Sequence, residues 1–488
     1  MSEQILLQGK LLGIEEFLLS GPDADPSRQS SENELAGRSQ WVTLLCEVLP
    51  RALLAELGLA RILLGSSGGG QFLVVLPGEA RQAGDDFLKA AAQHLRELGA
   101  GHLRLIWAIT ENLGDWSVVR KRLNDQLTQQ LGTPLASDGA SAFQPVMPGA
   151  APPGSREFGP DFGLHTRHIE SVGWSPEAPG DIVLDGGKHR WQLTTRITAE
   201  GIMLARHAAL TEDGKQPASL NTLAKRAQGR RTWGVLRGDV DSFGVRLRRV
   251  TSIEEHVPLS VLYKQFFAGE LEVLCSMPDF WRKVSILYSG GDDFAVFGSW
   301  DALIHFGREL QRLFHRFTEE NLKDYPGAEG KTITMALAVA PGRDTPFAHV
   351  YREAGENLEH AKSVDKDCMY LFGRVLEWRH LADAAELKEI VTRLEREYRG
   401  AKGLIRGLRH FYQKEAYGDP FREQGPLTQR TWRFQRRFNR LLAGTRNKEF
   451  QKLRAHLISE MAVKRSADVK LRPAGLVALE WARLATEV

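Results

Sequence analysis

The chain has 488 residues, of which 42% are hydrophobic and 26% are charged, and this composition excludes a disordered chain. No apolar run reaches the ~18 residues of a membrane helix, and residues 1–8 lack the pattern of a secretory signal. The three cysteines, Cys46, Cys275 and Cys368, form no C-x-x-C pair, which argues against a disulfide framework and a cysteine zinc site and favours the reducing cytoplasm.

Residues 1–135 alternate strand and helix patterns, which predicts a first α/β domain. Pro50 is expected to kink or divide the first helix, because proline lacks the N–H that a helix needs. Ser66, Ser67 and the three glycines that follow them predict a hairpin turn. Strands are expected at residues 6–12, 61–64, 72–76 and 103–109, and helices at residues 39–57 and 85–98.

Residues 136–230 are expected to hold a linker and a small connecting domain. Ala, Gly, Pro and Ser dominate residues 136–159, and such a stretch buries little apolar surface. The rest of the region mixes short patterns and ends in a basic run at Arg230 and Arg231. We therefore expect the next domain to begin at residue 231.

Residues 231–378 repeat the layout of the first domain. Self-similarity over a period this long indicates two related α/β domains and not a solenoid. Strands are expected at residues 233–240, 284–288, 294–297 and 333–339, and helices at residues 259–275, 301–317 and 349–362.

Residues 379–488 show helical periodicity and are expected to form a basic helical bundle. They hold 24 Lys and Arg against 13 Asp and Glu, a net charge of +11 in a chain whose total charge is +3. This asymmetry favours a polyanion or an acidic partner, with a solvated helical surface as the alternative.

One helix of this bundle is expected at residues 429–442. Arg433, Arg437 and Arg440 would share one of its faces, which favours docking on a neighbouring subunit or on an RNA backbone. Trp432 and Phe434 are more typical of a core than of base-stacking platforms.

A strand end and a hairpin turn carry the residues that indicate catalysis. Asp239 lies near the end of the strand at residues 233–240, and Gly290, Gly291, Asp292 and Asp293 form a turn between two apolar strands. Adjacent carboxylates repel each other unless a divalent cation neutralises them, and nucleotidyl transfer uses two such ions. Oxygen ligands favour Mg²⁺ or Mn²⁺ over zinc. The alternative is a plain hairpin turn, since Gly and Asp are common turn formers; the flanking strands and the upstream aspartate argue against it.

Lys362 ends the helix expected at residues 349–362. From this position its ammonium group could reach a triphosphate. The alternative is an exposed lysine that the dipole of the helix C-terminus favours.

These motifs resemble the large subunit of type III CRISPR effector complexes of the Csm type. The resemblance implies an α+β fold with two ferredoxin-like palm domains, a small connecting domain and a C-terminal helical bundle. The segments that carry it are residues 234–244, 288–293 and 354–362 for the second palm, residues 13–17, 37–39 and 67–72 for a first palm poor in carboxylates, and the basic tail for the C-terminal domain.

The resemblance also implies an activity. Members of this family convert ATP into cyclic oligoadenylate second messengers in antiviral defence when target RNA pairs with the guide RNA. Asp239, Asp292 and Asp293 would be catalytic and would hold Mg²⁺ or Mn²⁺. The implied partners are ATP, the guide–target RNA duplex and the other effector subunits, with no membrane. The implied nucleotide contacts are Ser67, Gly68, Gly69, Ser242, Phe243, Ser289, Gly290, Gly291 and Lys362.

The sequence departs from this family in two respects. Many members begin with a histidine–aspartate nuclease, but here the first palm starts close to Met1 and no His-Asp pair occurs, so we expect that nuclease to be absent. Many members also carry zinc-binding cysteine pairs, which are missing. The first palm reads Gly13-Ile-Glu-Glu16 in place of an Asp-x-Asp, so we expect a single metal-binding palm.

Two other functions remain open. One is a stand-alone cyclase resembling the GGDEF diguanylate cyclases, against which the tandem palms and the basic tail argue. The other is a scaffold subunit whose palm has lost its catalytic activity, and the intact aspartates argue against this alternative. Residues 242–248 lack the Asn with which diguanylate cyclases hold guanine; this absence and the family resemblance favour ATP.

Overall fold

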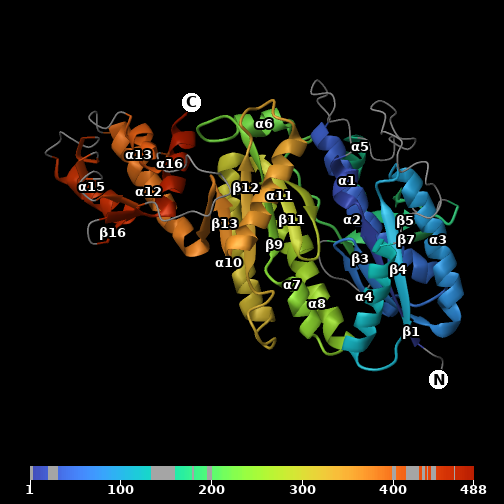
Figure 1. Cartoon of the computed structure of the whole chain (residues 1–488). Helices are drawn as coiled ribbons and strands as arrows, with labels where there is room; N and C mark the ends of the chain where they lie inside the picture. Colours follow the sequence, from blue (N-terminus) through green and yellow to red (C-terminus); the bar gives the residue numbers. More distant parts are fainter. Residues whose placement is uncertain are drawn as a thin grey trace.

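The structure is a computed structural model of the whole chain. It describes residues 4–19, 31–132, 160–177, 181–194, 201–397, 403–413, 428–430, 435–436, 438–440, 447–465 and 468–487. The linker expected at residues 136–159, together with Trp432, Arg433, Phe434 and Arg437, lies outside the described residues. Figure 1 shows the basic C-terminal region at one end, the second palm in the middle and the first palm at the other end.

The first palm is an antiparallel sheet in the order β2-β3-β1-β4 with helices packed on it. In β1, Ile5 and Leu7 pack in one buried cluster and Leu6 in another, because both faces of the sheet are covered there, and buried and partly exposed residues alternate only from Gln8 onward. The strands are β1 Gln4–Leu12, β2 Leu64–Gly68, β3 Gln71–Pro77 and β4 Arg104–Glu111; the helices are α1 Ile14–Leu19, α2 Ser31–Glu56, η1 Arg61–Leu63, η2 Gly78–Ala80, α3 Arg81–Leu98 and α4 Trp116–Gly132.

The second palm repeats this strand order and extends it. Its sheet runs β10-β11-β9-β12-β13-β14, and only the β12–β13 pair among these strands is parallel. The strands are β9 Trp233–Val240, β10 Val284–Ser289, β11 Asp293–Ser299, β12 Ile333–Val339, β13 Cys368–Leu371 and β14 Arg374–Glu377. The helices are α7 Phe243–Arg249, α8 Ile253–Gln265, η4 Phe266–Glu270, α9 Leu271–Cys275, α10 Trp300–Asn321 and α11 Phe347–Val364.

The two palms pack through reciprocal contacts. Helix α2 of the first palm lies against β10 of the second, and helix α8 of the second palm lies against β2 of the first. In each palm the edge hairpin therefore meets a helix of the other palm. The ends of both hairpins come together in this interface.

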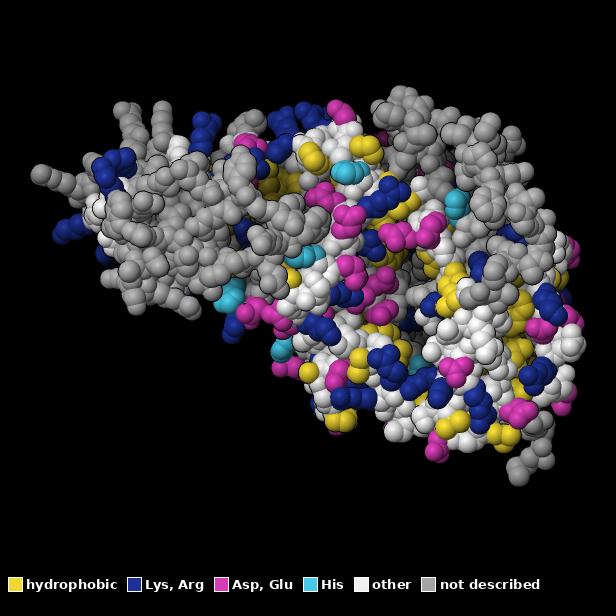
Figure 2. Space-filling model, viewed as in Figure 1, with side chains coloured by type: hydrophobic (Ala, Val, Ile, Leu, Met, Phe, Trp, Pro, Cys, Tyr) yellow, Lys and Arg dark blue, Asp and Glu magenta, His cyan; other side chains and the backbone are white. Residues whose placement is uncertain are grey.

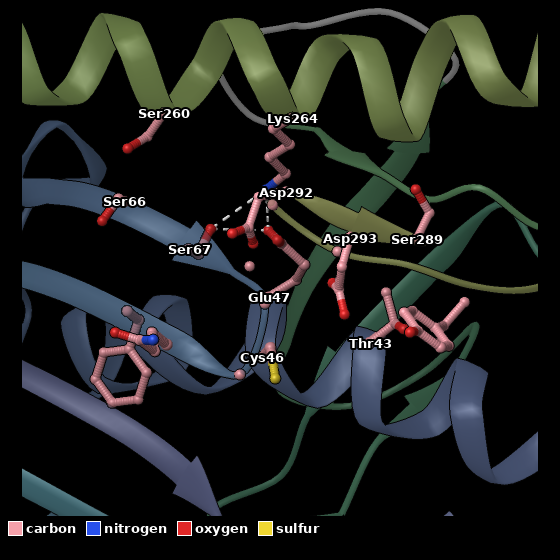
Figure 3. Close-up of a pocket in the computed structure, with 18 of the residues that line it drawn as sticks. Thr43, Cys46, Glu47, Ser66, Ser67, Ser260, Lys264, Ser289, Asp292 and Asp293 are labelled. Carbon is pink, nitrogen blue, oxygen red and sulfur yellow. Dashed lines mark hydrogen bonds and ion pairs between the residues drawn. The ribbon is translucent and has the colours of Figure 1, made fainter. Parts of the chain in front are cut away.

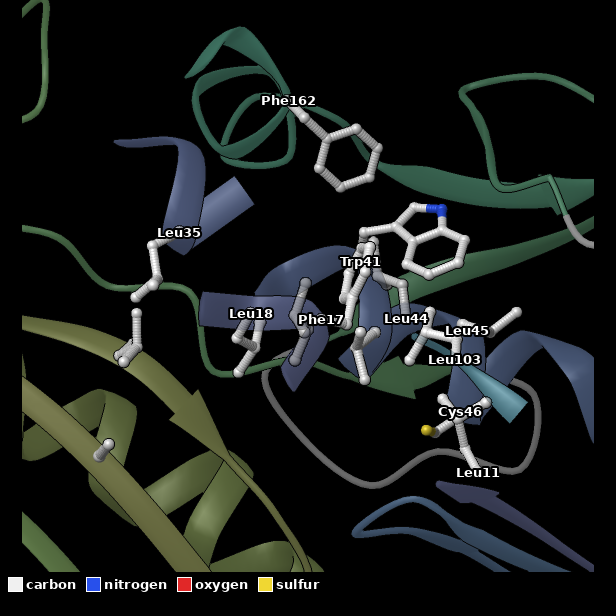
Figure 4. Close-up of a cluster of buried hydrophobic side chains, with 14 of the residues drawn as sticks. Leu11, Phe17, Leu18, Leu35, Trp41, Leu44, Leu45, Cys46, Leu103 and Phe162 are labelled. Atoms are coloured by element: carbon white, nitrogen blue, oxygen red, sulfur yellow. The ribbon is translucent and has the colours of Figure 1, made fainter. Parts of the chain in front are cut away.

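The long helix α2 passes through Pro50 without a break, so the expected division of this helix was wrong, whereas the expected kink stays a prediction. Val48, Leu49, Ala52 and Leu53 are all buried around the proline, and their packing outweighs the lost hydrogen bond. In Figure 4, Trp41, Leu44 and Leu45 of α2 lie in the buried cluster, and Phe162 of α5 (Pro160–His165) approaches them.

Three other expectations differ from the structure. Residues 61–63 form the 3-10 helix η1 and not a strand, since β3 pairs with β2 only from Leu64 onward and Ile62 is 90% exposed. The helix expected at residues 259–275 begins at Ile253, where Ser252 caps it, and contains the π-helical turn η4. Helix α4 was not predicted, although Trp116, Val119, Leu123 and Leu127 fall at helical spacing and are buried.

Between the palms, the chain forms a sheet in the order β6-β5-β7-β8 and two short helices. The strands are β5 Ser171–Trp174, β6 Val183–Leu184, β7 His189–Thr194 and β8 Ile202–Met203; α6 is Leu220–Lys225. The division of the whole chain into domains at residues 135, 230 and 378 stays a prediction.

The C-terminal region holds the expected helices and also a small sheet that was not expected. Thr428–Arg430, in the segment where a helix was predicted, forms β15 of the sheet β15-β17-β16. The helices are α12 Trp378–Glu397, α13 Leu404–Gln413, α15 Lys448–Met461 and α16 Pro473–Thr486; the other strands are β16 Ala462–Arg465 and β17 Asp468–Leu471. Among the described residues, no helix is long and apolar enough to cross a membrane.

Candidate active site

Three aspartates lie together at one end of the second-palm sheet. The register of β9 and β11 places Asp239 directly opposite Asp293. The N–H of Val240 donates to the carbonyl of Asp292 at 2.9 Å, and the N–H of Gly290 donates to the carbonyl of Asp293 at 2.7 Å. The sheet therefore fixes the backbone of all three predicted catalytic residues.

Glycine is required in the turn that carries the paired aspartates. A Cβ atom on Gly290 would lie 2.3 Å from Oδ1 of Asp293, which no other residue type could accept without moving that carboxylate. Gly69 of the first palm has φ +57°, and a Cβ atom there would lie 3.4 Å from the backbone nitrogen of Gly291. The glycine turns of the two palms thus face each other at close range.

The aspartates resist ionisation in this arrangement. Burial, followed by repulsion from Asp293 and Asp239, raises the pKa of Asp292 to about 7. Burial and the charge of Asp239 raise the pKa of Asp293 to about 6. Burial also raises the pKa of Asp239, although the ammonium of Lys362, 2.7 Å from Oδ1 of Asp239, opposes this shift.

The chemistry of these carboxylates fits a divalent cation. A cluster of like charges with raised pKa values gains most from a cation that neutralises it, and carboxylate oxygens suit Mg²⁺ and Mn²⁺. Within the described part of the chain, no three Asp, Glu, His or Cys side chains converge closely enough to form a preassembled metal site. Lys362 supplies positive charge to Asp239 instead.

A cavity of about 450 Å³ lies between the palms beside this turn. Figure 3 shows Ser67, Ser289, Asp292 and Asp293 around it, and in Figure 2 acidic and basic side chains gather where the surface is hollowed between the palms. The predicted site residues that line it are Ser67, Gly68, Gly69, Phe243, Ser289, Gly290, Gly291, Asp292 and Asp293.

Three predicted site residues lie outside this lining. Asp239 and Lys362 pair with each other behind the turn. Ser242 precedes α7 in the left-handed conformation, with φ +58°, and its hydroxyl accepts a hydrogen bond from Lys366 at 2.6 Å.

The second aspartate of the Asp-Val-Asp segment has a structural role. Asp241 is 3% exposed and accepts hydrogen bonds from the hydroxyls of Thr332 and Thr334 at 2.8 and 2.7 Å and from the N–H of Asp367 at 2.9 Å. These hydrogen bonds connect the end of β9 to β12 and to the loop before β13.

Sequence reasoning missed a buried ion network that crosses the interface. Glu47 of α2 pairs with Lys264 of α8, accepts from Nη1 of Arg51 at 2.8 Å and accepts from the hydroxyl of Ser67 at 2.9 Å. Burial would raise the pKa of Glu47, but the charges of Lys264 and Arg51 and the hydrogen bonds from Lys264 and Ser67 outweigh it. The pKa of Glu47 is therefore lowered to about 2. A signal was available: Glu47 and Arg51 are charged residues four apart in a run of apolar residues.

Sequence reasoning also missed an aromatic and cationic support behind Asp293. The guanidinium of Arg237 lies 4.4 Å from the centre of the Tyr351 ring. The hydroxyl of Tyr288 hydrogen-bonds to Asp293 and to Arg237, and Arg237 reaches Glu15 of the first palm at 3.5 Å. These residues line the same cavity as Asp293 and support its carboxylate.

Known proteins are similar to the part of the chain that carries this site. The family model described as Cas10/Cmr2, second palm domain, matches residues 232–370, which include all three aspartates and Lys362. The chain is 29% identical over 193 residues to the CRISPR system single-strand-specific deoxyribonuclease Cas10/Csm1 (subtype III-A) of Mycobacterium tuberculosis, a match that covers 33% of this chain and 23% of that protein. It is 25% identical over 171 residues to the protein of the same description from Thermococcus onnurineus, covering 32% and 21%. The matched part thus spans about a quarter of each curated relative.

Solved structures share the fold over nearly the whole chain. Csm1 of T. onnurineus matches with a TM-score of 0.69 and 17% identity, covering 100% of this chain and 70% of that one. The Csm1–Csm4 cassette in complex with cA3 matches with a TM-score of 0.70 and 16% identity, covering 99% and 70%. These similarities confirm the predicted fold class with its palm domains and C-terminal helices.

Proposed function

We propose that this chain, a relative of the Cas10/Csm1 proteins whose residues 232–370 form the second palm domain of the Cas10/Cmr2 family, makes cyclic oligoadenylates from ATP. It would do so as the large subunit of a type III CRISPR effector complex with target RNA bound. The observation that carries the proposal is the group of three aspartates beside a cavity that both palms line. Solved relatives that share the fold are complexes with cA3, cA4, AMPPNP and ATP, which supports this choice of ligand.

The residues in and beside the cavity would have different roles in this reaction. A divalent cation, Mg²⁺ or Mn²⁺, would be held by Asp239, Asp292 and Asp293 and would supply charge neutralisation and activation of the attacking hydroxyl. The facing glycine turns let phosphates approach the backbone. Lys362 adds positive charge beside Asp239, and Tyr288 fixes the orientation of Asp293.

Replacement of the paired aspartates tests this proposal. The variant Asp292→Ala/Asp293→Ala, assembled in the effector complex with target RNA, ATP and Mg²⁺, should lose product by at least about 1,000-fold, because charge stabilisation of the transferring phosphoryl group is lost. Asp324→Ala, at an exposed position of the same palm, is the matched control and should keep activity. Undiminished synthesis by the double variant would refute the assignment.

The choice of nucleotide is tested in the same assay. ATP with Mg²⁺ or Mn²⁺ should give cyclic oligoadenylates, whereas GTP alone should give little product. Use of GTP with ATP inert would favour a GGDEF-like cyclase, and no product from either nucleotide would favour a scaffold subunit.

RNA and the other effector subunits are the proposed partners. The C-terminal region carries a net charge of +11, and Arg436 and Arg440 are exposed there. Positive charge of this kind suits the phosphate backbone of a guide–target duplex or an acidic neighbouring subunit.

A further inference from the structure

An arginine of the first palm holds the short helix that follows β9 in the second palm. Arg120 of α4 donates from Nη1 to the carbonyl of Leu247 and from Nη2 to the carbonyl of Arg248, the latter at 2.7 Å. Both carbonyls belong to the last turn of α7. One guanidinium group therefore closes the C-terminal end of a helix in the other palm.

Helix α7 depends on partners outside itself. It has only seven residues, and helices this short are not stable on their own in water. Its C-cap residue Val250 is extended, with φ −66° and ψ 129°, so α7 does not end in the left-handed cap that would satisfy its last carbonyls. Because the C-terminal end of a helix carries partial negative charge, a cationic donor such as Arg120 suits these carbonyls.

A second contact of α4 lies beside the first. The rings of Trp116 in α4 and His256 in α8 have their centres 5.6 Å apart. Burial, followed by the charge of Arg120, lowers the pKa of His256 to about 4, so this histidine is neutral at pH 7 and does not repel the guanidinium. In Figure 1, α4 accordingly lies beside α7 and α8.

Helix α7 forms part of the wall of the cavity between the palms. Phe243 and Leu247 both line this cavity, and residues four apart lie on the same face of a helix. Phe243 also packs against Tyr263 of α8, with ring centres 4.7 Å apart. Only residues 241 and 242 separate α7 from β9, which carries Asp239. A shift of α7 would therefore move an apolar wall of the cavity and the turn next to Asp239.

We propose that Arg120 is a positioning residue for nucleotide binding, which holds α7 so that Phe243 and Leu247 form the apolar wall against which the base lies. Binding cavities contact the flat apolar parts of their ligands mainly through apolar and aromatic side chains. The first palm thereby shapes a site whose aspartates belong to the second palm. The inference rests on the proposed function, because it assigns a role in binding the substrate of that reaction.

Binding of two probes to the full chain tests the inference without turnover. AMPPNP and inorganic triphosphate, each with Mg²⁺, are titrated calorimetrically into the parent and its variants. Arg120→Ala should weaken AMPPNP binding about ten-fold and leave triphosphate binding unchanged, because the wall contacts the base and not the phosphates. Arg120→Lys keeps one donor and should lose less. Arg122→Ala, which removes an exposed arginine of the same helix, is the matched control and should change neither affinity.

A double-mutant cycle shows whether Arg120 acts through α7. In a Phe243→Ala background, Arg120→Ala should weaken AMPPNP binding by about two-fold or less, because the wall is already lost. Amide hydrogen exchange at residues 243–249 should also be faster in Arg120→Ala than in Arg122→Ala. Additive losses in the cycle or equal exchange rates would overturn the positioning role.

The outcomes separate this inference from the proposed function. Unchanged AMPPNP affinity in Arg120→Ala, or no binding of AMPPNP to the parent, would overturn the inference. An equal loss for triphosphate would also overturn it and would make Arg120 a phosphate contact. A loss confined to AMPPNP supports it even if the chain makes no product from ATP, in which case the proposed function alone would fail.

Discussion

Two neighbouring carboxylates at the end of a buried sheet oppose each other's ionisation. Burial is the main cause that raises the pKa values of Asp292 and Asp293 to about 7 and about 6, and the charge of Asp239, which the β9–β11 register places beside them, raises both further. The residues therefore store electrostatic strain that a bound cation would relieve.

The first prediction concerns stability and pH without added metal. The pKa of Asp292 is raised from 3.8 to about 7, so the folded protein binds this proton more tightly than the unfolded chain. Ionisation costs stability as pH rises between these values, and the cost is absent below pH 3.8 and complete above pH 7. Asp292→Asn should raise stability at pH 8 by on the order of 2 kcal/mol after allowance for solvent screening, and leave it unchanged at pH 4.

Thermal unfolding at the two pH values measures this effect. Asp324→Asn, at an exposed position, should have no effect at either pH. A stabilisation by Asp292→Asn that is equally large at pH 4 would contradict the electrostatic explanation.

The second prediction concerns Tyr288 as a positioning residue. Its hydroxyl lowers the pKa of Asp293 by hydrogen bonding, against the larger effect of burial. Tyr288→Phe should therefore move the acid limb of the pH–rate profile to higher pH and lower the rate at neutral pH about ten-fold. Tyr370→Phe, in β13, is the control. An unshifted profile would assign Tyr288 to packing alone.

At the scale of elements, helices α2 and α8 hold the palms together because each of them packs on the other palm. Each helix lies on the edge hairpin of the other palm, and Glu47 and Lys264 pair across the contact. Both side chains are largely buried, at 4% and 19% exposure, so neither charge can be hydrated fully if the other is removed.

The third prediction follows from this pair. Lys264→Met should destabilise the protein by about 3 kcal/mol or more, because Glu47 then keeps a buried charge with one partner fewer. Adding Glu47→Gln should restore part of this loss, which a double-mutant cycle on thermal unfolding measures. The exposed pair Arg312–Glu309 should give a coupling energy below about 1 kcal/mol. Additive effects of Lys264→Met and Glu47→Gln would contradict a stabilising Glu47–Lys264 ion pair.

Local pattern predicted many of these elements well. The strands expected at residues 233–240 and 333–339 match β9 and β12 at both ends, because both segments are mainly apolar and lie between polar residues. The sheet at Thr428–Arg430 could not be predicted in this way, since it depends on pairing with Asp468–Leu471, a segment distant in sequence.

At the scale of the whole molecule, the repeat in the sequence predicted two palms but not how they meet. The turn with Asp292 and Asp293 and the strand with Asp239 were recognisable, because strand, glycine and carboxylate patterns are local; their catalytic role stays a prediction. The ion pair that Glu47 and Lys264 form between the palms could not be predicted, because these residues are 217 positions apart in the sequence and meet only when the palms pack.

The fourth prediction concerns the basic C-terminal region. Arg436 and Arg440 are exposed, whereas Phe438 between them is buried. Arg436→Glu/Arg440→Glu should weaken assembly of the RNA-containing complex and reduce the slope of log affinity against log salt by roughly two, if each arginine contacts a phosphate. Arg312→Glu, on the second palm, should leave assembly unchanged. Equal affinities of parent and variant at low and high salt would leave a solvated surface as the explanation.

The π-helical turn η4 has a consequence for the length of the chain. Its wide turn joins α8, which carries Lys264 toward the first palm, to α9, whose Leu271, Leu274 and Cys275 pack inside the second palm. If the same residues formed a regular α-helix, the segment would hold one residue too many, and one end would rotate by about 100° against the other. Lys264 would then leave Glu47 or the apolar side chains would leave their core. The π-helical turn takes up this extra residue, so that the helix from α8 to α9 contacts the first palm with Lys264 and packs in the core of the second palm with its other end.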